Sequence, residues 1–318
     1  MDKIFVQRDL RRRFGYSGLT VLVYYFILDI AVSVTLFFDS FLYLINHAFN
    51  PNGVQGDIFK RLADNGWGYI LGCIIGGSIL MFWKKPRFCL KDIWRGNKPM
   101  TGKAFSVLFC VFISGQALFV VLEPLLEWLL NLIGLSGRGA LESVTGASDS
   151  VSMFLYVSLF APVFEEILFR GLILRNLMPY GKKFAILSSA FLFGLFHGNL
   201  TQSLYAFAVG LVLGYAAAEY SLGWAVLLHF INNFILGDLF SWAMELYPAA
   251  HLEIILYALI FGCAVVSLIL AAVKSRSIAD YLTSKKIHPL CIRCFFTSPG
   301  VLVFTIYMAL NMLLLLFI

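Results

Sequence analysis

Charged residues are scarce in this sequence: Asp, Glu, Lys and Arg make up 13% of its 318 residues, whereas hydrophobic residues make up 60%. With a mean hydropathy of +0.85, the chain has too little polar surface for a domain surrounded by water, which excludes a soluble fold. Cysteine is sparse too, and the six cysteines lie in apolar runs or basic loops without a secreted-type framework. A small secreted domain held together by disulfides is therefore excluded as well.

Several functional signatures are also absent. No internal repeat and no matching pair of broken helices is visible, which weakens an interpretation as a carrier. No His-Glu-x-x-His occurs, Phe112-Ile113-Ser114-Gly115 lacks the leading glycine of Gly-x-Ser-Gly, and Ile235-Leu236-Gly237-Asp238 lacks the first glycine of Gly-x-Gly-Asp. These absences disfavour the membrane proteases that carry those three motifs.

Long apolar runs are abundant instead. A helix of ~20 apolar residues crosses a hydrocarbon layer of ~30 Å and satisfies its own backbone hydrogen bonds in lipid. We therefore predict an all-α fold, a polytopic bundle of about 8–9 transmembrane helices. The candidate spans are Leu19–Ile45, Gly68–Trp83, Ala104–Leu135, Val151–Leu177, Phe184–His197, Leu204–Ala218, Trp224–Phe240, Ile254–Val273 and Val301–Ile318, the third ending in an amphipathic turn after Glu123-Pro124.

The first span has no small-residue cleavage pattern after it, so we expect it to be retained, with no soluble domain before or after the bundle. We divide the chain into N-terminal helices with basic loops (1–150), a core that carries the motifs described below (151–245) and C-terminal helices (246–318).

Basic residues concentrate in every second connection between the spans. They are Lys3, Arg8, Arg11, Arg12, Arg13, Lys84, Lys85, Arg87, Lys91, Arg95, Lys98, Lys103, Lys182, Lys183, Lys274, Arg276, Lys285, Lys286 and Arg293. This alternation follows the positive-inside rule and predicts a cytoplasmic N-terminus. Loops that face anionic lipid headgroups account for the net charge of +6, so we expect membrane lipid and no nucleic acid as a partner.

The first chemically informative pattern is Glu165-Glu166-Ile167-Leu168-Phe169-Arg170, inside an apolar helix. Glu166 and Arg170 are four residues apart, with the acid on the N-terminal side, which favours a helical ion pair. Glu165 points about 100° away. A single Glu–Arg pair would most simply be a packing device, but two carboxylates with one arginine leave an excess negative charge that is costly in a membrane.

Two further patterns are Phe193-Gly194-Leu195-Phe196-His197 and His229-Phe230-Ile231-Asn232-Asn233. Each histidine alone would more often be an interhelical hydrogen-bonding residue. However, Glu165 and His197 each lie sixteen residues from Gly181, which puts them at similar depth on two antiparallel helices. His229 and Asn233 share a helix face, so all four side chains are expected to approach a common layer within the membrane.

The order and spacing of these motifs, from Phe164 to Asn233, resemble those of the CAAX-protease and bacteriocin-processing (CPBP) family of intramembrane peptidases. The small-residue pattern Gly210-x-x-x-Gly214 is also similar. The resemblance implies that Glu165 is the general base acting on water and that His197 helps to hold that water or a metal. It implies that His229 and Asn233 stabilise the oxyanion.

The same resemblance implies that Glu166 and Arg170 fix the helix that presents Glu165. The residues leave the cofactor open. Glu165, His197 and His229 would satisfy a catalytic zinc ion with water in the fourth position, whereas an asparagine is a poor zinc ligand and suits a metal-free mechanism equally well.

Two functions therefore remain in view. The first is an intramembrane endopeptidase of a bacterial cell membrane that cleaves a lipidated peptide, a leader peptide or a membrane-associated protein. The second is a non-catalytic immunity factor, scaffold or small transporter that uses the polar cluster for packing or ligand binding.

Overall fold

The computed structural model describes residues 3–49, 64–84, 91–138, 150–247, 250–284 and 286–317. The basic residues Lys85, Arg87 and Lys285, and one of the six cysteines, Cys89, lie outside these ranges. Within them the secondary structure is helical and contains no strand, which confirms the predicted all-α, polytopic fold.

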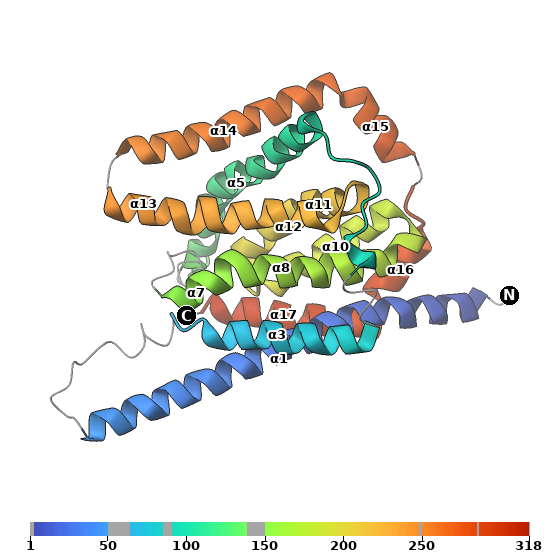
Figure 1. Cartoon of the computed structure of the whole chain (residues 1–318). Coiled ribbons are helices and arrows are strands. Elements are labelled where there is room, and N and C mark those ends of the chain that lie inside the picture. Colours follow the sequence, from blue (N-terminus) through green and yellow to red (C-terminus); the bar gives the residue numbers. More distant parts are fainter. Residues whose placement is uncertain are drawn as a thin grey trace.

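The chain forms the elements drawn in Figure 1. They are α1 (Lys3–Phe49), α3 (Trp67–Lys84), η1 (Asp92–Trp94), α5 (Gly102–Asn131), α7 (Val151–Leu155), η2 (Tyr156–Phe160), α8 (Ala161–Glu166), η3 (Ile167–Leu174), α9 (Arg175–Leu177), η4 (Met178–Tyr180), α10 (Lys182–Phe196), α11 (Leu200–Glu219), α12 (Leu222–Phe230), η5 (Ile231–Leu239), α13 (Phe240–Leu246), α14 (Ala250–Val273), α15 (Ser275–Thr283), α16 (Pro289–Phe296) and α17 (Pro299–Leu315).

Among the described residues, six helical segments are long and apolar enough to cross a membrane, or seven if the bent pair α16–α17 is one span. Length explains the difference from the nine predicted spans. The predicted spans Gly68–Trp83 and Phe184–His197 are both helical, but α3 and α10 have only 18 and 15 residues. The predicted turn after Pro124 is absent, because α5 continues through this proline to Asn131.

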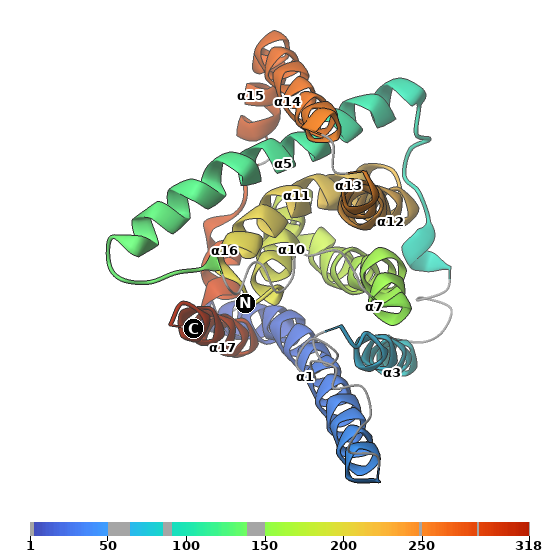
Figure 2. The same ribbon diagram turned by 90° about the vertical axis from the view of Figure 1, so that its left-hand side faces the viewer.

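The central helices are α10, α11 and the run α12–η5–α13. In the view along the bundle, α5 and α14 cover one side of them, and α1, α3 and α17 lie on the opposite side (Figure 2). Helices α10 and α11 approach closely because of Gly194, where a Cβ atom would lie 2.7 Å from the carbonyl oxygen of Ser203. Gly210 likewise lets α11 lie close to Arg170, since a Cβ there would lie 3.1 Å from Arg170 Nη2. Small residues thus bring α11 against the helices that carry the site.

The described basic connections gather at one end of the bundle, which we call the basic end. Glu219, at the end of α11, pairs with Lys98 at 3.1 Å and with Lys182 at the start of α10. Lys183 donates to the backbone carbonyl of Tyr281 on α15. Near the N-terminus, the ring of Phe14 packs on that of Tyr180 at 4.9 Å. The alternation of charge along the sequence therefore corresponds to a real asymmetry between the two ends.

Candidate active site

Glu165 and Glu166 are the last two residues of α8, in the middle of a continuous helical run from Val151 to Tyr180. The segments η2 and η3 on either side of α8 are π-helical, with hydrogen bonds that reach back five residues and not four. Such segments change the direction in which successive side chains point. Both glutamates are buried, and they therefore lie in the interior of the bundle and not on its lipid-facing surface.

Pro162 explains why the helix departs from α geometry in η2. A proline has no N–H and cannot complete the ladder inside a helix. In η2 the N–H of Ala161 donates to the carbonyl of Tyr156, five residues earlier. The next acceptor in that register is the carbonyl of Val157, whose donor would be Pro162. Since Pro162 cannot donate, the Val157 carbonyl is left for a partner from outside the helix.

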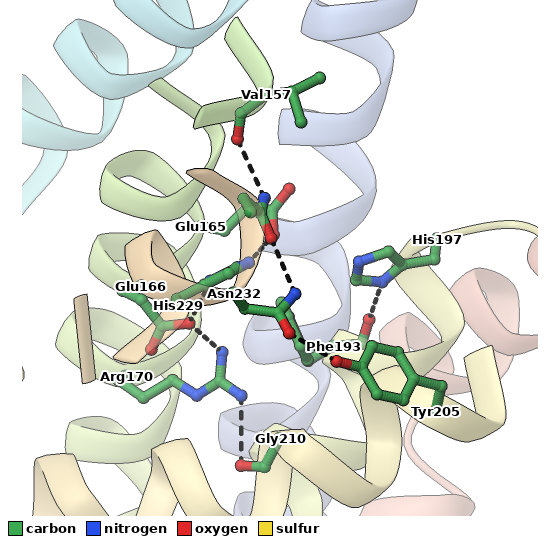
Figure 3. Close-up of polar contacts among 11 residues, drawn as sticks. Val157, Glu165, Glu166, Arg170, Phe193, His197, Tyr205, Gly210, His229 and Asn232 are labelled. Atoms are coloured by element: carbon green, nitrogen blue, oxygen red, sulfur yellow. Dashed lines mark hydrogen bonds and ion pairs between the residues drawn. The ribbon is translucent and has the colours of Figure 1, made fainter. Parts of the chain in front are cut away.

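Glu166 and Arg170 form the ion pair that their spacing predicts. Arg170 Nη1 donates to Glu166 Oε1 at 2.7 Å, and neither side chain has any exposed surface. Arg170 Nη2 donates to the carbonyl of Gly210 at 3.2 Å, and the guanidinium lies 4.1 Å from the centre of the Phe193 ring. One arginine thus ties α8 and η3 to α10 and α11 (Figure 3).

His229 contacts both glutamates. Its Nδ1 lies 3.0 Å from Glu166 Oε1, and because a carboxylate oxygen accepts, Nδ1 is the donor. Its Nε2 faces Glu165 Oε2 at 4.0 Å, too far for a direct hydrogen bond. Among the described residues Glu165 has no hydrogen-bond partner, and 12% of its side chain is exposed. The second carboxylate that seemed to lack a counter-charge in the sequence therefore lies beside an imidazole.

His197 caps the C-terminal end of α10 and lies apart from Glu165 and His229 in Figure 3. Its Nδ1 is 2.9 Å from the carbonyl of Phe193, so Nδ1 carries the proton and Nε2 keeps its lone pair. The Phe193 ring lies between the two histidines, with its centre 4.8 Å from His197 and 5.8 Å from His229. The predicted site residues are thus on adjacent helices, but His197 makes no polar contact with the other three.

Asn233 lies in η5, and its Nδ2 donates to the free carbonyl of Val157 at 2.9 Å. Its Oδ1 accepts from Asn232 Nδ2 at 3.1 Å. Asn232 Oδ1 in turn accepts from Gln116 Nε2 and from Tyr205 OH, both at 2.8 Å. Asn233 is therefore the last member of a chain of hydrogen-bonded side chains that begins on α5 and α11.

Sequence reasoning did not select Gln116, Tyr205 or Asn232. The signal for Gln116 was weak but present, because it is an uncharged amide in an otherwise apolar run of α5. Asn232 was passed over because the spacing from His229 pointed to its neighbour. No pattern in the sequence marks Tyr205, whose role depends on a contact between helices distant in the chain.

The residues do not fit a metal site in this arrangement. No group of three or more His, Cys, Asp or Glu side chains among the described residues converges closely enough to hold an ion. Glu165 and His229 face each other across 4.0 Å, but His197 makes no polar contact with either of them. We therefore derive no chemical step through a metal.

The comparisons with known proteins agree with the motifs. The family model described as type II CAAX prenyl endopeptidase Rce1-like matches residues 147–235, the segment that carries Glu165, Glu166, His197, His229 and Asn233. This match, which covers less than a third of the chain, confirms that the segment resembles the CAAX-protease and bacteriocin-processing family. Neither the curated proteins nor the solved structures gave a match. The apolar helices indicate an integral multi-pass membrane protein, and residues 147–235 are similar to a family of membrane proteases that cleave peptides.

Proposed function

We propose that the protein is an intramembrane endopeptidase in which Glu165 acts as the general base on a water molecule. The observation that carries this proposal is the arrangement around His229: Glu166 holds Nδ1 at 3.0 Å, and Nε2 faces the otherwise unbonded Glu165 carboxylate across 4.0 Å. Two hydrogen bonds of about 2.8 Å that meet at roughly a right angle span such a gap, so one oxygen atom fits between the two groups. That position suits a water, which can donate to the Glu165 carboxylate and accept from His229 Nε2.

The four ionisable groups also balance in charge. With His229 as an imidazolium, two carboxylates face two cations, and both imidazole nitrogens are donors. The Nδ1–H group of His229 then remains hydrogen-bonded to Glu166, and its Nε2–H group is free to donate to an oxyanion. Arg170, bonded to Glu166 at 2.7 Å, keeps that carboxylate in place. This supports a role for Glu166 and Arg170 in positioning both Glu165 and His229.

In the proposed reaction, water attacks the carbonyl carbon of the scissile peptide bond while Glu165 takes one of its protons. His197, whose Nε2 keeps its lone pair, accepts a hydrogen bond from the same water. Nε2 of His229 and Nδ2 of Asn233 donate to the oxyanion of the tetrahedral intermediate. When the C–N bond breaks, Glu165 passes the proton to the leaving amine. A metal ion is not part of this scheme.

The family match and the burial of the site among the helices support a choice of substrate class. We propose a peptide held at the membrane, either lipidated near its C-terminus or a leader peptide, in a bacterial cell whose cytoplasm faces the basic end. A quenched-fluorescence peptide ending in a farnesylated Cys-aliphatic-aliphatic-x sequence tests the first class. Comparison of the peptides released in membranes that contain the wild-type or the inactive protein tests the second.

The decisive variant is Glu165→Gln. Glutamine keeps the shape and still forms hydrogen bonds, but it cannot accept a proton from water, so cleavage should fall by about 100-fold to 10,000-fold. Folding and membrane insertion should be unchanged. Glu123→Gln on α5 is a matched control, because Glu123 makes no hydrogen bond or ion pair with the described site residues. Cleavage by Glu165→Gln at the wild-type rate would instead favour the non-catalytic functions.

A further inference from the structure

We infer that Gln116, Tyr205 and Asn232 form a hydrogen-bond relay that fixes the side-chain amide of Asn233 in the orientation needed for oxyanion stabilisation. The inference rests on the proposed function, because it assigns these three residues as positioning residues for Asn233. It also brings α5 into the active site, although Gln116 lies outside the matched residues 147–235.

The donors and acceptors of the relay can be assigned in only one consistent way. Gln116 Nε2 has two hydrogens and donates one to Tyr205 OH at 2.7 Å and the other to Asn232 Oδ1 at 2.8 Å. Tyr205 OH donates its single hydrogen to the same Oδ1 at 2.8 Å. Both lone pairs of Asn232 Oδ1 are therefore occupied. A flipped Asn232 would set its amino group against two donors, so the Nδ2 atom must face Asn233.

The orientation of the Asn232 amide determines that of the Asn233 amide. Its Oδ1 accepts from Asn232 at 3.1 Å, so its amino group points the other way, toward the Val157 carbonyl at 2.9 Å. That carbonyl is free because Pro162 has no N–H to give it. One hydrogen of the Asn233 amino group is used by Val157, and the second remains for a substrate oxygen. The amide is thus fixed from both ends before a substrate arrives, which is the preorganisation that an oxyanion hole requires.

The relay also has little room to relax. Tyr205 and Asn232 come from α11 and η5, and the Tyr205 ring packs against Phe119 on α5 with the ring centres 5.4 Å apart. Gly115, next to Gln116, lets α11 come close, since a Cβ at that position would lie 2.7 Å from Val209 Cγ1. Helices α5 and α11 are therefore held together by packing as well as by hydrogen bonds, and Asn232 joins η5 to both of them.

A double-mutant cycle with the farnesylated peptide tests the inference. Gln116→Met keeps the side-chain length and removes both donors, and we expect kcat to fall about tenfold with KM nearly unchanged, as for the loss of one buried hydrogen bond. Asn233→Ala alone should lower kcat by at least about 100-fold. Because Gln116 acts through Asn233, adding Gln116→Met to Asn233→Ala should cause no further loss.

Two variants serve as checks on folding and specificity. Tyr205→Phe removes only one hydroxyl and should give a smaller loss of kcat in the same direction, which guards against a Gln116→Met protein that does not fold. Ser114→Ala on α5 is the matched control, because Ser114 donates only to the carbonyl of Val111 in its own helix, at 2.7 Å. It should leave kcat unchanged.

A second readout does not depend on cleavage. In protein labelled with ¹⁵N-asparagine, the side-chain amide signals of Asn233 can be assigned by their loss in Asn233→Ala, and Gln116→Met should shift them whereas Ser114→Ala should not. Unchanged Asn233 signals, or a kcat loss of equal size with and without Asn233, overturn the relay even in an active protease. Shifted signals in a protein whose Glu165→Gln variant cleaves normally support the relay and overturn the proposed catalytic function.

Discussion

The substitution Arg170→Ala should destabilise the protein strongly. Arg170 and Glu166 have 0% side-chain exposure and are joined at 2.7 Å, and the second carboxylate oxygen, Glu166 Oε2, is buried without a hydrogen-bond partner among the described residues. Without the guanidinium, the carboxylate keeps only His229 as a donor. Breaking a buried pair by removing one partner costs about 3–5 kcal/mol. Against a total stability of about 5–15 kcal/mol, this loss is large.

The measurement is thermal unfolding of purified protein in detergent, together with the amount of protein that accumulates in membranes. Arg175→Ala is the control, because Arg175 donates only to the backbone carbonyls of Ile93 and Arg95, at 3.1 and 3.0 Å, and its removal leaves no buried charge. We expect a loss of about 1 kcal/mol there.

Removing both charges provides the second test of the same argument. The double variant Glu166→Gln/Arg170→Met leaves no isolated charge, so it should recover much of the stability that Arg170→Ala loses. It should nevertheless cleave poorly, because Glu166 no longer holds His229 as a carboxylate. If Arg170→Ala unfolds like Arg175→Ala, the buried pair does not stabilise the bundle and the reasoning is wrong.

Three further outcomes are expected. A metal chelator should leave cleavage intact, since the described donors do not converge; loss of cleavage that zinc restores would show a metal mechanism. A cysteine introduced at Lys98 should react in intact cells only with membrane-permeant reagents, and labelling by an impermeant maleimide beyond the level of the parent protein would reverse the proposed topology. Glu219→Gln should lower stability by about 1 kcal/mol, measured by thermal unfolding, because its pairs with Lys98 and Lys182 are partly exposed; an unchanged transition would mean that these pairs do not hold the basic end.

Composition and local spacing predicted much of this architecture. Low charge and long apolar runs indicated the helical bundle, because lipid leaves few alternatives for the backbone. The four-residue spacing of Glu166 and Arg170 predicted their ion pair, because it depends only on one turn of one helix. These features are local, and one sequence is enough to derive them.

The remaining features depend on contacts between distant segments. The π-helical segments next to Glu165 and His229 change the hydrogen-bond register, and a periodicity based on α-helices does not include them. Pro162 was a usable signal, because a proline within an apolar helix marks a freed carbonyl. However, its partner Asn233 lies 76 residues from Val157, and local spacing could not pair them.

The site contains two polar systems of different kinds. Glu165, Glu166, Arg170 and His229 form an ionic cluster, whereas Asn233 belongs to a chain of neutral amides and a hydroxyl. No hydrogen bond joins the two systems among the described residues. The ionic cluster depends on complementary charges in a buried setting, and the neutral chain depends on donor and acceptor polarity alone. The proton-accepting group and the oxyanion donor are therefore oriented by separate sets of contacts, so a substitution in one set need not disturb the other.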